Sequence, residues 1–194
     1  MKAAAKKRKA APAGSSLTKS AREWMYTQRP ALLFAGRFVL WVTALTALSL
    51  TAPFQHLLHG YLGGIARLAS GLLNRLGIDS HANDVTVSSA RYALTVAESC
   101  SGLELMLFLF STILAFPIAW RWKWPGIAVG ALLISLTNLI RVASLFAVGV
   151  YRPAAVEMVH LEIWPLGLVV ITLVCWLVWM QWATRAGASC LHAS

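Results

Sequence analysis

Four stretches of this chain are each about twenty residues long and almost wholly apolar, as helices that cross a bilayer are. They are residues 31–52, 100–120, 124–150 and 163–182. Backbone polar groups in hydrocarbon must be satisfied within their own segment, so each stretch is predicted to be a helix. With 58% hydrophobic and 12% charged residues, a water-soluble globule is excluded. The sequence therefore predicts an all-α integral membrane protein with about four transmembrane helices.

Lys and Arg are unevenly distributed around these spans. They gather in the tail 1–30, in the loop 121–123 and at Arg185, whereas the opposite side holds Arg67, Arg75, Arg91 and Arg152. Cytoplasmic loops carry the excess of Lys and Arg in membrane proteins. We therefore expect both termini in the cytoplasm.

The same pattern divides the chain into three parts. Residues 1–30 are basic and poor in apolar side chains, which predicts a disordered cytoplasmic tail. Residues 31–182 form the membrane-embedded domain, and residues 183–194 form a short cytoplasmic tail. The net charge of +10 is better explained by orientation and contact with anionic membrane lipid than by binding to nucleic acid.

The region between the first two spans is more than a loop. Apolar side chains recur at helical spacing from Phe54 to Leu76, with polar ones on the opposite face, and Gly77 offers a stop. This pattern predicts an amphipathic helix on the outer membrane interface. Residues 85–87 and 92–96 then alternate like two short strands, which predicts a small outer β-hairpin.

Three reactive side chains are predicted to lie at one depth. At a rise of about 1.5 Å per residue, Cys100 sits at the outer mouth of the second span and Arg141 about 25 Å from the inner end of the third. His160 stands just before the fourth span. A nearby base activates a thiol, and a guanidinium suits the oxyanion of acyl transfer, so the set fits thiol catalysis at the outer face.

The remaining candidates have simpler interpretations. Cys175, in an apolar span, and Cys190, in the short tail, are expected to be structural. We expect no metal and no cofactor, because the one His pair with ligand spacing, His56 and His59, lies on a polar face without a third ligand. Glu104 is a candidate partner for Arg141.

The segment Ala97-Glu-Ser-Cys-Ser-Gly-Leu103, followed by Asn138-Leu-Ile-Arg-Val142 and then His160, resembles the exosortase/archaeosortase family of membrane cysteine transpeptidases. The resemblance covers residues 31–182. It implies that Cys100 is the nucleophile, Arg141 the oxyanion-side cation and His160 the acid/base. A His in third place is similar to the bacterial branch. Ser101 and Gly102 beside the thiol, Asn138 beside Arg141, and Glu104 are expected to support these residues.

The resemblance also implies a substrate, the C-terminal sorting signal of a secreted protein. Such a signal comprises a short motif, a transmembrane helix and a basic end, and it is cleaved and passed to an acceptor. The chain has fewer spans than the larger exosortases and is similar to the compact exosortase H type, whose targets carry a Pro-Thr-Leu-x-x-Trp-like signal.

Two other classes stay open at this point. In a non-enzymatic membrane scaffold or assembly factor, Arg141 and Glu104 would form a structural pair and Cys100 would be incidental. In a small-molecule transporter, Arg141 would bind an anion, but polar residues that cluster at one face rather than at the midplane disfavour this class.

Overall fold

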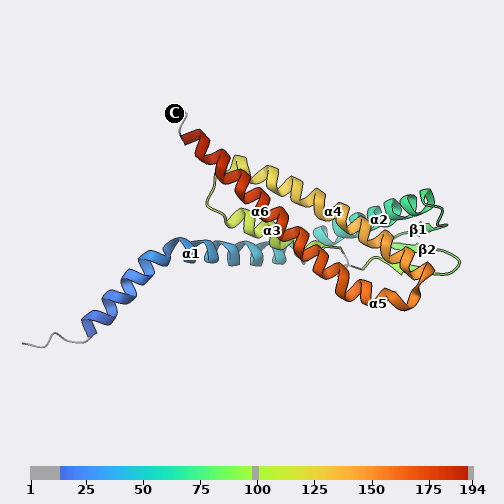
Figure 1. Ribbon diagram of the computed structural model, residues 1–194, viewed down its shortest axis with the longest axis horizontal. Coiled ribbons are helices and arrows are strands. Elements are labelled where there is room, and N and C mark those ends of the chain that lie inside the picture. The colour runs from blue at the N-terminus through green and yellow to red at the C-terminus, as the bar shows by residue number, and fades with distance from the viewer. Residues whose placement is uncertain (1–13, 98–100, 192–194) are drawn as a thin grey trace, which may run out of the picture.

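The computed structural model describes the backbone of residues 14–97 and 101–191, and the side chains of residues 28–97 and 101–186. It is an elongated bundle of helices with a small sheet near one end (Figure 1). In chain order the elements are α1 (Gly14–Ser49), α2 (Ala52–Arg75), β1 (His81–Asn83), β2 (Thr86–Ser88), β3 (Ala93–Thr95), α3 (Leu103–Ala115), α4 (Trp120–Tyr151), η2 (Pro153–Ala155), α5 (Val156–Met158), η3 (Val159–Ile163) and α6 (Trp164–Leu191).

Within the described residues, three helical segments are long and apolar enough to cross a membrane: Gln28–Ser49 in α1, Trp120–Tyr151, and Pro153–Ala186. They correspond to the first, third and fourth predicted spans, so the all-α membrane fold is confirmed. Helix α1 begins at Gly14, earlier than the predicted span, and bends along its length (Figure 1). We attribute the bend to Pro30 inside the helix, because proline removes one backbone hydrogen bond.

Helix α3 is shorter than the predicted span 100–120. Its 13 residues rise about 20 Å, against about 30 Å for a hydrocarbon core. At its start Gly102 takes a left-handed conformation (φ 72°), and at its end Phe116 is extended, as a residue before proline prefers. The Nζ of Lys123 donates a hydrogen bond to the carbonyl of Leu114, which satisfies one of the last acceptors of α3.

Helix α2 confirms the predicted amphipathic helix, and Gly77 (φ 78°) follows its end. One side of α2 packs against α4 and against the sheet, and Leu62, Ala66 and Leu73 are buried there. The hairpin of β2 and β3 is also confirmed, with Val87 opposite Leu94. The sheet has a further strand, β1, which the sequence did not predict and which pairs antiparallel with β2.

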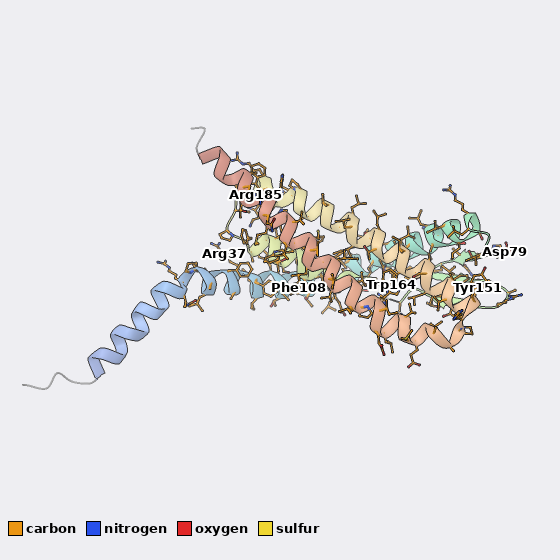
Figure 2. All side chains as sticks on the ribbon, in the orientation of Figure 1. Arg37, Asp79, Phe108, Tyr151, Trp164 and Arg185 are labelled. Carbon is orange, nitrogen blue, oxygen red and sulfur yellow. The ribbon has the colours of Figure 1, made fainter. Side chains whose placement is uncertain are left out.

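The core falls into two clusters. One joins α2, the sheet and α4 around Phe146, and the other joins α3, α4 and α6 around Ile134 and Trp179. The indole of Trp179 occupies the space that a side chain at position 126 would need, so glycine there lets α6 approach α4 closely. The two ends of the bundle also differ: Arg37 and Arg185 lie at one end, and Asp79 and Tyr151 at the other (Figure 2).

Candidate active site

One face of α4 carries the buried polar residues of the candidate site. Ile134, Asn138 and Arg141 are three or four residues apart, so they lie above one another on the helix surface. Asn138 is fully buried and Arg141 is only 6% exposed. Burial of a guanidinium in a membrane-spanning helix is costly and rare, which sets this face apart from the rest of a largely apolar helix.

Arg141 and His160 are brought together although nineteen residues separate them in the sequence. The two groups lie close enough for the charge of Arg141 to act on the imidazole. Hydrogen bonds also join the start of α6 to α4 beside Arg141. The indole Nε1 of Trp164 donates to Ser144 Oγ (3.1 Å), and that hydroxyl donates to the carbonyl of Arg141 (2.9 Å). Trp164 lies between the end of the bundle that holds Arg37 and Arg185 and the end that holds Asp79 and Tyr151 (Figure 2).

His160 itself lies in η3, a five-residue π-helix that leads directly into α6. A π turn widens the helix by one residue and is frequent at functional sites. The segment is partly exposed: His160 is half-buried, whereas Leu161 and Glu162 face outward. The imidazole is therefore open to the surroundings on one side and to Arg141 on the other.

Cys100 lies outside the described residues, as do its neighbours 98 and 99. The described residues on either side are well buried at Val96 and Ser101. Ser101 Oγ accepts a hydrogen bond from the backbone N–H of Leu103, which starts α3. A Cβ on Gly102 would lie 3.1 Å from Ile134, so the end of this segment packs against the same face of α4 that carries Asn138 and Arg141.

Between Val96 and Gly102 the described residues are not helical, although the sequence predicted a helix from residue 100. Non-helical backbone at membrane depth is tolerated only where protein buries it or where it lines a water-filled cavity. An apolar cavity of about 320 Å³ adjoins it, lined by Ser101, by Leu103 and by residues of α2 that include Phe54 and Tyr61. There is therefore room for an apolar group beside the segment that carries the thiol.

The structure describes the surroundings of two of the expected supporting residues, Glu104 and Asn138. Glu104 is exposed in the first turn of α3, where its charge suits the helix dipole, and among the described residues it forms no ion pair with Arg141. The Asn138 carboxamide has no hydrogen-bond partner among the residues that the structure describes, at either its nitrogen or its oxygen. A buried amide in this state has unused capacity for a ligand.

Metal binding finds no support in the described part of the chain, where no three His, Cys, Asp or Glu side chains group together. His59 instead pairs with Asp84 at 2.9 Å and ties α2 to the turn between β1 and β2. Sequence reasoning missed the contact between Ser144 and Trp164, which joins α4 to the start of α6. The available sequence signal was the hydroxyl of Ser144, one turn after Arg141. Its partner, the indole of Trp164, lies on another helix, so the contact itself could not be predicted.

A sequence model of the transmembrane exosortase family matches residues 10–180. The chain belongs to this family. No curated protein and no solved structure matches the chain. The family match spans most of the chain, from α1 through most of α6, and includes every element that forms the site. The protein is therefore an exosortase-family membrane protein, and the family supports a transpeptidase-type function for it.

Proposed function

We propose that this exosortase is a cysteine transpeptidase that cleaves C-terminal sorting signals of secreted proteins. The observation that carries the proposal is the approach of Arg141 to His160 on the α4 face against which Gly102, two residues after Cys100, also packs. In this proposal, three chain segments that are remote in sequence contribute to one site. A thiol, a base and a fixed guanidinium are the groups that acyl transfer through a thioester requires.

In the proposed reaction, His160 takes the proton of the Cys100 thiol, and the thiolate attacks the carbonyl carbon of the scissile peptide bond. Arg141 donates hydrogen bonds to the resulting oxyanion, because its planar fork stays charged at any physiological pH. The C–N bond then breaks, and the leaving amine takes the proton from His160. An acceptor nucleophile attacks the thioester, gives up its proton to His160 and releases the thiol.

Asn138 is a second donor in this proposal. Its amide is fully buried one turn from Arg141, and its polar atoms have no partner among the described residues. The N–H groups of the carboxamide can therefore donate to the substrate carbonyl without giving up a protein contact. The site would then hold the oxyanion from one helix face with two side chains of different charge.

The charge distribution supports an orientation for the site. The end of the bundle that holds Arg37, Arg121, Lys123 and Arg185 is taken to be cytoplasmic, in a bacterial inner membrane. Arg141 is about 25 Å along α4 from Trp124, which would set the reaction at the periplasmic face. A substrate with a periplasmic motif, a transmembrane helix and a basic cytoplasmic end would then present its motif at that depth.

The decisive test co-expresses the protein with a reporter that ends in such a sorting segment, taken from the same genome, and follows cleavage by gel shift. Cys100→Ala and Cys100→Ser should abolish processing, whereas Cys175→Ala, on α6, should leave it unchanged. Cys100 should also react with a membrane-impermeant thiol probe from the periplasmic side. Processing that survives Cys100→Ala would remove the enzyme proposal and leave a scaffold or assembly factor.

A further inference from the structure

Strand β3 forms one outer edge of the sheet, whose strand order is β1-β2-β3. The backbone N–H of Val96 donates to Val85, and the N–H of Ser89 donates to the carbonyl of Tyr92. Antiparallel strands alternate between hydrogen-bonded and non-bonded pairs, so the even-numbered residues of this strand turn their N–H and C=O groups toward β2. Ala93 and Thr95 consequently direct theirs away from the sheet.

The side chains on this edge leave it accessible. Ala93 and Thr95 are exposed, whereas Leu94 and Val96 point into the core beneath the sheet. Within the described residues no strand pairs with the outer edge of β3. A short edge strand with small side chains and outward backbone groups can accept a further strand from another chain.

The direction of β3 follows from its contacts with α4. Just before β3, the ring of Tyr92 fills the space beside Gly149 and lies edge-to-face with Phe146 at 5.8 Å between centroids. After β3, Gly102 packs against Ile134. Tyr92 therefore lies beside the end of α4 near Tyr151, and Gly102 lies beside the middle of α4, so β3 starts at the Tyr151 end. Cys100 follows β3 in the sequence, five residues after Thr95.

We propose that the outer edge of β3 binds the extended segment of the substrate as a fourth strand, parallel to β3. This inference rests on the proposed function. A substrate that enters from the periplasm and continues into the membrane travels in the same direction as β3, so its strand would be parallel. Backbone hydrogen bonds to Ala93 and Thr95 would then deliver the scissile carbonyl to the residues that follow β3, largely independently of the substrate's side chains.

The first experiment removes one outward N–H with proline and follows cleavage of the same reporter. Ala93→Pro should lower the processing rate by about tenfold or more, because proline cannot donate to a strand. The matched control is Ala82→Pro. Val87 directs its backbone groups toward β3, so Ala82, which lies opposite Val87 in β1, directs its own N–H outward at the other edge of the sheet. Replacing Ala82 with proline should therefore leave processing within about twofold.

The second experiment needs no catalysis and keeps the inference testable where proline disturbs folding. In a background with Cys100→Ala, Cys175→Ala and Cys190→Ala, single cysteines at position 93 or 95 are oxidised against a cysteine scan of the reporter's motif. A parallel strand predicts that position 93 cross-links to reporter residues nearer the N-terminus than those that cross-link to position 95. The reverse order, or no cross-link at either position, overturns the parallel strand.

The outcomes separate this inference from the proposed function. If Cys100→Ala still cleaves the reporter, the enzyme assignment fails. If Cys100→Ala is inactive while Ala93→Pro cleaves as fast as the unmodified protein, the enzyme assignment stands and the edge is not the binding surface. If Ala82→Pro loses as much activity as Ala93→Pro at equal thermal stability, the effect belongs to the whole sheet and the edge proposal is overturned.

Discussion

Replacing Asn138 with leucine should make this protein more stable and less active. The side chain is fully buried, and its two polar atoms have no hydrogen-bond partner among the described residues. A buried polar group without a partner costs about 1–3 kcal/mol, and leucine has the same branched arrangement of side-chain heavy atoms as asparagine. At roughly 2–4 °C per kcal/mol for a chain of this size, Asn138→Leu should raise the Tm by about 2–12 °C.

The same change should lower processing by about 10²-fold, as the loss of an oxyanion donor does. Thermal unfolding in detergent and the reporter gel shift measure the two effects on one preparation. Thr172→Val is the matched control, because it removes a buried hydroxyl that does have a partner, the carbonyl of Leu168 at 2.8 Å. It should not raise the Tm and should leave processing unchanged. A lower Tm for Asn138→Leu, or processing at the normal rate, would refute the assignment of this amide as a ligand donor.

Two further changes test the site and its support. Arg141→Lys keeps the charge but loses the planar fork, so processing should fall about 10²-fold by gel shift while the protein still inserts; Arg37→Lys, at the end of the bundle that also holds Arg185, should be tolerated within about twofold. Phe146→Ala removes a fully buried ring from the core between α2, the sheet and α4, and should lower the free energy of unfolding by about 3–5 kcal/mol, whereas Phe108→Ala, at a position that is 53% exposed, should cost far less in the same denaturation assay.

Periodicity and hydropathy were sufficient to predict the helices whose formation depends only on the local spacing of apolar residues. They predicted α2 and the first, third and fourth spans, because these follow from the length and the 3.6-residue period of an apolar or amphipathic helix. They overestimated α3, since hydropathy does not register the left-handed Gly102 or the Lys123 hydrogen bond that satisfies the last turn. Both features depend on contacts with another helix.

Elements held by remote partners could not be predicted. Strand β1 is three polar or small residues, and only its pairing with β2 makes it a strand. The bond between Trp164 and Ser144 joins α6 to α4 through two residues that are twenty positions apart. No sequence pattern predicts the π-helix around His160, because its wider turn has no distinct composition.

That π-helix makes the site sensitive to deletions in a way that substitutions would not reveal. A π turn is a helical turn with one additional residue, and removing Leu161 or Glu162 would restore ordinary α-helical winding. Trp164 would stay bonded to Ser144, but everything before the deletion would rotate by about 100° around the helix axis. His160 would then point away from Arg141. The length of this segment, more than the identity of its exposed residues, therefore determines whether the imidazole faces the guanidinium.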